Sequence, residues 1–225
     1  MRTPLSLPVR DRSRSTGLSG RIMGMGSSAD VKAVLLTIAK RDHDATIALL
    51  TGAPSLVRDS LARSDEFFLA DRFAQIYEGD TALHAASFSY DTEMARVLIA
   101  RGADIRARNR RGAEPLHAAV MGNPTSPTWN PEEQRDVIVF LVESGADPNA
   151  AAVGGVTPLH RAVRNRRSAA VETLLRAGAD PGLPNDSGST AADLASLTTG
   201  RGGSGSVEAK VEQRIILELL ESSTP

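Results

Sequence analysis

The sequence predicts an all-α fold built as a solenoid of stacked helix–turn–helix units, and two repeated motifs with one shared spacing support this. The first motif reads GDTALHAA at Gly79, GAEPLHAA at Gly112, GVTPLHRA at Gly155 and GSTAADLA at Gly188. The second reads RGAD at Arg101, SGAD at Ser144 and AGAD at Ala177. The first motif recurs after 33, 43 and 33 residues and the second after 43 and 33, so both share one register. A shared register indicates one repeated supersecondary unit, with a ten-residue insertion in one member.

The unit from Gly155 shows why each repeat should fold as two short helices. Pro158 suits the first position of a helix, where the missing N–H has no partner in any case. Gly178 follows the second helix, where a left-handed residue commonly ends a helix. The apolar positions between them have helical spacing and are Leu159, Ala162 and Val163, then Ala170, Val171, Leu174 and Leu175. One such pair cannot bury both of its faces, so each unit needs neighbours.

The Thr-Pro-Leu-His run from Thr157 to His160 closely resembles the ankyrin repeat, and the likeness extends over residues 30–222. It implies an ankyrin-repeat α-solenoid over residues 29–222 with about five repeats and projecting β-turn fingers. The repeats would be 29–78, which is degenerate, 79–111, 112–154 with the insertion, 155–187, and 188–222, which caps the C-terminal end.

Both ends of this array depart from the motif. Residues 1–28 hold five arginines against one acid and little periodic apolar surface, which predicts a disordered basic arm. Two alternatives are a tether for nucleic acid and a mistaken start before Met23 or Met25. Asp30 is expected to cap the first helix. In the final repeat, the buried stripe is expected to be Val211, Ile215, Ile216, Leu219 and Leu220.

Two insertions could form sites of their own. The segment between Gly52 and Gly79 holds Phe67, Phe68, Phe73 and Tyr77, and we expect an extra helix over residues 61–70 that packs its aromatic side chains on the first repeat. The alternative is an exposed apolar patch for a ligand. In the third repeat, Asn130 and Pro131 predict a helix start. Trp129 is then expected to act as a hydrophobic staple on that helix, or alternatively as an exposed binding anchor.

Motifs that could carry chemistry are weak. His84, His117 and His160 occupy equivalent places, but one histidine per repeat without a second ligand type makes a poor metal site. The family resemblance implies that each ring instead bonds to backbone in a finger turn. Gly200, Gly202 and Gly205 match G-x-G-x-x-G, but without a preceding strand the match predicts only a linker. We therefore expect neither an enzyme nor a cofactor.

Composition restricts the partners and the compartment. The net charge of −1 argues against nucleic acid as a whole-chain partner. The chain has no cysteine, and no apolar run reaches the roughly 18 residues that a membrane span requires. Because no secretory signal is recognisable either, we expect a cytoplasmic monomer that does not enter membranes.

The resemblance implies a module that binds another protein on the concave face of the solenoid. Carrying the family's contact positions over by motif gives Tyr77, Phe88, Arg108, Arg110, Arg111, Met121, Val153 and Arg164. The finger at residues 105–112 holds four arginines and no acid, which favours a partner with an acidic surface. The alternative is a ligand-binding or catalytic pocket formed by the inserted loops around Phe67, Trp129 and Gly202.

Overall fold

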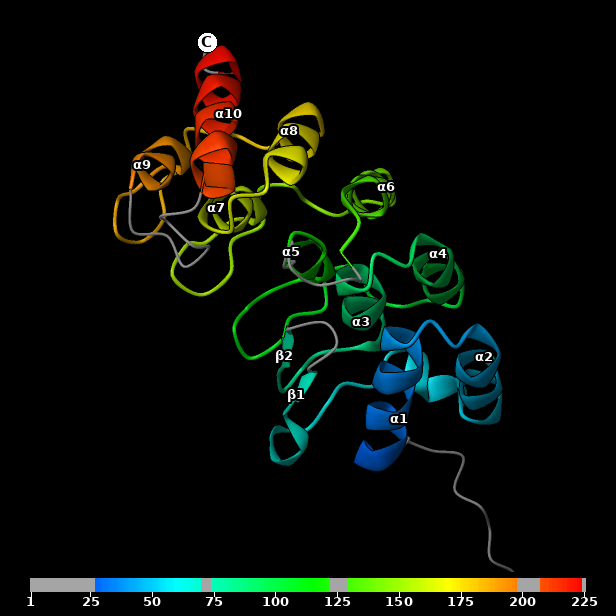
Figure 1. Ribbon diagram of the computed structural model, residues 1–225. Coiled ribbons are helices and arrows are strands. Elements are labelled where there is room, and N and C mark those ends of the chain that lie inside the picture. Colours follow the sequence, from blue (N-terminus) through cyan, green and yellow to red (C-terminus); the bar gives the residue numbers. More distant parts are fainter. Residues whose placement is uncertain (1–26, 70–73, 122–128, 198–206, 224–225) are drawn as a thin grey trace, which may run out of the picture.

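Paired helices stacked in two rows make up the fold. A computed structural model describes residues 27–69, 74–121, 129–197 and 207–223. The inner row consists of α1 (Ser28–Ala39), α3 (Ala82–Phe88), α5 (Pro115–Ala119), α7 (Pro158–Arg164) and α9 (Ala191–Ser196). The outer row consists of α2 (His43–Gly52), α4 (Thr92–Ala100), α6 (Pro131–Glu143), α8 (Ser168–Arg176) and α10 (Val207–Ser223). Figure 1 shows each inner helix beside its outer partner along the stack, so the all-α solenoid prediction is confirmed.

The predicted apolar stripes form one continuous core. In α7 and α8 the positions Leu159, Ala162, Val163, Ala170, Val171 and Leu174 are all buried. Three fully buried alanines, Ala86, Ala119 and Ala162, recur at the same place of the motif along the inner row. Small side chains let neighbouring helices approach closely, so the whole core is filled with few aromatic residues.

The N-cap of the first helix lies three residues earlier than predicted. Ser27 is the N-cap: its Oγ accepts from the backbone N–H of Asp30 at 3.3 Å. In return the Asp30 carboxylate accepts from the Ser27 backbone N–H at 3.0 Å. Asp30 is therefore the reciprocal member of a capping box, and its assignment as the cap was wrong. The predicted arm at residues 1–28 lies almost wholly outside the described residues.

The inserted segment after the first repeat does not form the predicted helix over residues 61–70. It contains two short 3₁₀ turns, η1 (Pro54–Val57) and η2 (Arg63–Asp65), and then a hairpin of β1 (Phe67–Leu69) and β2 (Ala74–Ile76). Aromatic side chains favour strands, and this apolar run is too short to give a helix a buried stripe. Phe67 is half-buried beneath the Lys32 ammonium, whose nitrogen lies 4.8 Å from the ring centre, whereas Phe68 is 58% exposed. Phe73 lies outside the described residues.

The final helix buries a narrower face than predicted. Ile216 and Leu220 are buried, as expected, together with Ala209. Val211 and Ile215 are 50% and 38% exposed, so their assignment to the buried stripe was wrong. They lie four residues apart at the edge of the buried face, and Leu219, which follows on the same line, is half-buried against the core. Residues 198–206, which include the glycine-rich motif, lie outside the described part.

The three repeated histidines join consecutive repeats. In His84, His117 and His160, Nδ1 accepts from the backbone N–H three residues earlier, so the proton must be on Nε2. Each Nε2 then donates at 3.0 Å to a carbonyl of the next finger: Ala113, Val156 and Ser189. The backbone role implied by the family resemblance is what the geometry shows. In the last repeat Asp193 takes the histidine's place and accepts from the Thr190 N–H at 2.8 Å.

The turn between the two helices of a repeat carries a left-handed residue that is not glycine. Arg41, Tyr90 and Arg166 have φ angles of 57°, 56° and 54°. Each of these side chains reaches a backbone carbonyl of the following repeat. Arg41 donates to Ser89 and Tyr90, Tyr90 to Met121, and Arg166 to Ala209. These contacts offset the strain of a conformation that non-glycine residues rarely adopt.

Finger glycines and helix-end glycines should differ in their tolerance of a side chain. A Cβ on Gly155, at φ 67°, would lie 2.7 Å from the backbone nitrogen of Asp186. Gly145 is also left-handed, at φ 104°, but a Cβ there meets nothing within 4 Å. We expect Gly145→Ala to lower the free energy of unfolding by about 1 kcal/mol and Gly155→Ala by roughly 2–4 kcal/mol. Urea denaturation of both variants tests this, and equal losses would contradict the close packing of adjacent fingers.

The histidine bonds should make stability depend on pH. Burial, and then the nearby charge of Arg161, lowers the pKa of His117 to about 3, while the unfolded chain keeps an ordinary value near 6.5. Between these values the unfolded state binds the extra proton, so the folded state loses stability as pH falls from 6.5 towards 3. At pH 5 this single site should cost about 2 kcal/mol relative to pH 7. The loss measured by urea denaturation should shrink by that amount in His117→Gln. An undiminished loss would show that His117 is charged in the fold.

Candidate partner-binding groove

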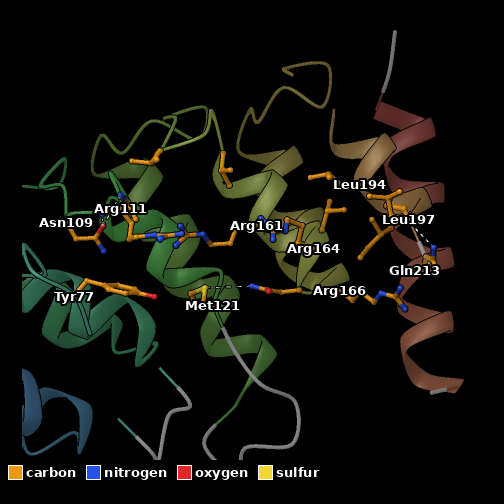
Figure 2. Close-up of a pocket in the computed structure, with 17 residues that line it drawn as sticks. Tyr77, Asn109, Arg111, Met121, Arg161, Arg164, Arg166, Leu194, Leu197 and Gln213 are labelled. Atoms are coloured by element: carbon orange, nitrogen blue, oxygen red, sulfur yellow. Dashed lines mark hydrogen bonds between the residues drawn. The ribbon is translucent and has the colours of Figure 1, made fainter. Parts of the chain in front are cut away.

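A groove of about 530 Å³ runs along the inner side of the stack, lined by residues from the fingers, the inner helices and α10. Figure 2 shows Tyr77, Asn109 and Arg111 at one end and Leu197 and Gln213 at the other. The groove therefore spans several repeats, and no single repeat could form it. Its lining residues are Tyr77, Asn109, Arg111, Ala113, Met121, Val153, Val156, Arg161, Val163, Arg164, Asn165, Arg166, Leu194, Ala195, Leu197, Gln213 and Ile216.

The charged side chains of this groove are all basic. Arg111, Arg161, Arg164 and Arg166 line it, and no aspartate or glutamate does among the described residues. None of these four arginines takes part in the ion pairs found in the described part of the chain. The groove thus presents positive charge that the described fold does not neutralise by direct pairing.

Arg161 lies at the centre of this charge. Its Nη1 donates to the carbonyl of His117 at 3.2 Å, which holds the side chain along the inner helices. The pKa of Arg161 is lowered to about 10, mainly by burial; the positive charges of Arg111 and Arg164 also lower it, while Tyr77 and Asp80 act in the opposite direction. Asp80 is itself held by the Asn109 amide at 2.8 Å and the Tyr77 backbone N–H at 2.7 Å. The guanidinium is therefore less favourably placed than one in water.

Arg166 is the most buried of the four, with only 5% of the residue exposed. Its Nη1 donates to the Ala209 carbonyl at 3.1 Å. Its Nη2 is buried and has no hydrogen-bond partner among the described residues. A buried donor without an acceptor costs free energy, and more so when it carries charge.

Apolar and amphipathic side chains alternate with the arginines. Val153 and Leu197 are 69% and 55% exposed, although both are apolar. Tyr77 lies half-buried at one end, and the Met121 sulfur lies 3.7 Å from the amide nitrogen of Asn165 near the middle (Figure 2). A surface that combines arginine, tyrosine, methionine and exposed aliphatic side chains is typical of protein-binding sites.

The structure brings together five of the eight residues that the sequence predicted as contacts: Tyr77, Arg111, Met121, Val153 and Arg164. Phe88 instead packs half-buried against the core. Arg108 and Arg110 are engaged by acids from outside the finger, Glu114 and Glu66 respectively. The side-chain hydrogen bond from Arg110 is also the main reason why the pKa of Glu66 falls to about 2. Arg110 further lies over the Tyr77 ring, 4.9 Å from its centre.

Sequence reasoning missed Arg161 and Arg166. A signal for Arg161 was present, because it occupies the place that Ala85 and Ala118 hold in the other copies of the motif. Nothing in the local sequence marks Arg166, because its burial depends on α10, which lies more than 40 residues further along the chain.

The inserted loops around Phe67 and Trp129 do not contribute to this groove in the described part of the molecule. Neither Phe67 nor Trp129 lines the groove, and Gly202 lies outside the described residues. Trp129 is half-buried, with the Arg167 guanidinium 5.8 Å from its ring centre. The fourth residue of α6, where a staple needs an apolar partner, is Gln134, whose amide donates to the Ala119 and Met121 carbonyls. The predicted staple therefore lacks its usual partner.

Residues 27–69, 74–121, 129–197 and 207–223 hold neither a metal-binding cluster nor a membrane-spanning helix. No three histidine, aspartate or glutamate side chains gather there in a way that could hold a metal ion. None of the helices in these ranges is both long enough and apolar enough to cross a membrane.

Helix pairs in register, fingers coupled by a histidine in three consecutive repeats and a groove along the inner helices define a helical repeat protein. Comparison with family models gives the same result: a model of three ankyrin repeats matches residues 35–152, and a model of many ankyrin repeats matches residues 140–195. The chain belongs to the ankyrin repeat family.

Curated relatives match part of the chain and a smaller part of themselves. Mouse ankyrin repeat and SOCS box protein 16 is 37% identical over 117 residues, which is 51% of this chain and 25% of that protein. The mouse B-cell lymphoma 3 protein homolog is 37% identical over 110 residues, or 48% of this chain and 22% of that protein. Protein PhlB of Serratia liquefaciens is 38% identical over 101 residues, or 44% of this chain and 40% of that protein. The matched segment is thus less than half of each of these relatives.

Two arginines that both contact carbonyls should respond oppositely to removal of their charge. Arg41 pairs with Glu133, which raises its pKa, and also donates to two carbonyls of the next repeat. We expect Arg41→Met to lower the free energy of unfolding by about 1–2 kcal/mol. Arg161→Met removes a poorly solvated charge that other arginines repel, so stability should stay within about 0.5 kcal/mol of wild type or rise. Urea denaturation measures the free energy of unfolding of both variants. A large loss in Arg161→Met would show that Arg161 stabilises the fold.

Proposed function

We propose that this protein is an interaction module that binds a protein partner in the groove between its fingers and inner helices. Ankyrin repeats generally mediate protein–protein interaction, and the family is generally non-catalytic. One observation supports the groove as the binding surface. Exposed apolar side chains, Tyr77 and four arginines without a carboxylate partner among the described residues converge there from several repeats. Tyrosine and arginine contribute strongly to interface energies.

The architecture also suits binding with little ordering. The groove residues lie on short helices and on finger turns that the histidine bonds join to the preceding repeat. Preformed surfaces lose little conformational entropy on association, so more of the contact energy contributes to affinity. A partner would meet a shaped surface that is already in place.

A capture experiment with matched surface variants tests the proposal. Tyr77→Ala combined with Val153→Ser alters the groove, whereas Val139→Ser alters an exposed apolar position, 40% exposed, on the outer helix α6. Immobilised wild type and both variants are incubated with lysate of the source organism, and bound proteins are quantified by mass spectrometry. We expect the specific partners to fall about tenfold or more with the groove variant and to be unchanged with Val139→Ser. Equal capture by all three proteins would place the binding surface elsewhere.

A further inference from the structure

The arginines of the groove differ from other arginines of the same chain. Arg41, Arg63, Arg108, Arg110 and Arg176 each pair with a glutamate. Arg111, Arg161, Arg164 and Arg166 share one surface on which none has a carboxylate partner among the described residues. Glutamates thus neutralise five other arginines, but no aspartate or glutamate among the described residues lines the groove. Like charges held together in this way are stabilised when a bound anion supplies the missing counter-charge.

We propose that the groove binds an extended acidic segment of a partner protein, whose aspartate or glutamate side chains pair with Arg111, Arg161, Arg164 and Arg166. This inference rests on the proposed function of the groove as the protein-binding surface, and it specifies the chemistry of the partner. The guanidinium fork matches a carboxylate geometrically, so each pair can form two parallel hydrogen bonds.

The buried Nη2 of Arg166 supports this occupant independently of the surface charge. Arg166 lines the groove although only 5% of the residue is exposed, and its Nη2 is buried without an acceptor among the described residues. Its neighbour Nη1 is already satisfied by the Ala209 carbonyl. A carboxylate oxygen is the strongest acceptor that a peptide can offer to such a donor.

The distribution of charge favours a peptide over a nucleic acid. Figure 2 shows Arg111 near Tyr77 and Asn109, and Arg166 at the opposite end near Gln213, with Arg161 and Arg164 between them. Apolar side chains, among them Val153 and Leu197, lie along the same groove. Separate single charges with apolar surface between them match a segment that alternates acidic and aliphatic residues. Domains that bind a nucleic-acid backbone are usually strongly basic as a whole, whereas this chain has a net charge of −1.

The test uses defined probes and the full chain. The first probe is a fluorescein-labelled peptide of roughly twelve residues that alternates glutamate and leucine with glycine spacers and reaches about 40 Å when extended. The second replaces every glutamate by glutamine. A single-stranded oligonucleotide of similar length and inorganic phosphate are the third and fourth probes. The affinities of the two peptides and the oligonucleotide, all carrying the same fluorescent label, are measured by fluorescence anisotropy. Phosphate is tested by its ability to displace the labelled glutamate peptide.

We expect the glutamate peptide to bind at least about tenfold tighter than the glutamine peptide, with an affinity that falls as salt rises. Arg161→Gln combined with Arg164→Gln should weaken the glutamate peptide by about tenfold or more. The control is Arg135→Gln combined with Arg96→Gln, which removes two exposed arginines from the outer helices α6 and α4 and should leave binding unchanged. Thermal melting of each variant shows that it is folded.

Other outcomes overturn the inference in distinguishable ways. Tighter, arginine-dependent binding of the oligonucleotide would make the groove a nucleic-acid site. Displacement of the peptide by low concentrations of phosphate would indicate a small-anion site. Equal affinity for the glutamate and glutamine peptides would show that the groove does not recognise carboxylates. If the groove variant Tyr77→Ala with Val153→Ser still loses its partners in that last case, the proposed function stands and only the acidic chemistry fails.

Discussion

The fold depends on one repeated hydrogen bond, from the Nε2 of a buried histidine to a carbonyl of the following finger. His84, His117 and His160 each make it at the same distance. This holds although the ten-residue insertion places the acceptor of His117 further away in the sequence than the acceptors of the other two. The bond requires a neutral ring with the proton on Nε2, which the backbone N–H at Nδ1 enforces. Because the rings are buried, each also satisfies a backbone carbonyl that would otherwise be costly to bury. The fingers are thereby held in register with the helices, and the groove takes its shape from that register.

The arginines fall into two groups that differ in their partners. Arg41 and Arg110 pair with acids from distant segments and tie one repeat or insertion to another. Arg161 and Arg166 contact backbone carbonyls but line a groove to which the described residues contribute no acid, and burial makes the surroundings of Arg161 less favourable than water. Proteins commonly sacrifice some stability where a surface must remain available to a ligand. The contrast identifies the groove more directly than the number of arginines does.

Much of the fold could be predicted from the sequence because its determinants are local and periodic. Apolar spacing placed the stripes of α7 and α8, and Asn130 with Pro131 placed the start of α6. The hairpin after the first repeat could not be predicted in this way, since a short aromatic run such as that at Phe67 suits a helix or a strand until its neighbours are known. The counter-ion of Arg110 comes from Glu66, 44 residues away. Side-chain pairing over such a distance leaves no periodic signal, so the free and the neutralised arginines could not be separated beforehand.

The left-handed turn residues give the stack a polarity. Arg41, Tyr90 and Arg166 hold a strained backbone conformation, and each finds its acceptor in the repeat that follows. The histidines also donate in that direction. Removal of a repeat from the C-terminal side therefore leaves its predecessor with a strained turn and with these side-chain donors unpaired, whereas removal from the N-terminal side leaves the same set of side-chain donors paired. Nearest-neighbour coupling in this array is thus unequal in the two directions, and fraying should advance more readily from the C-terminal end.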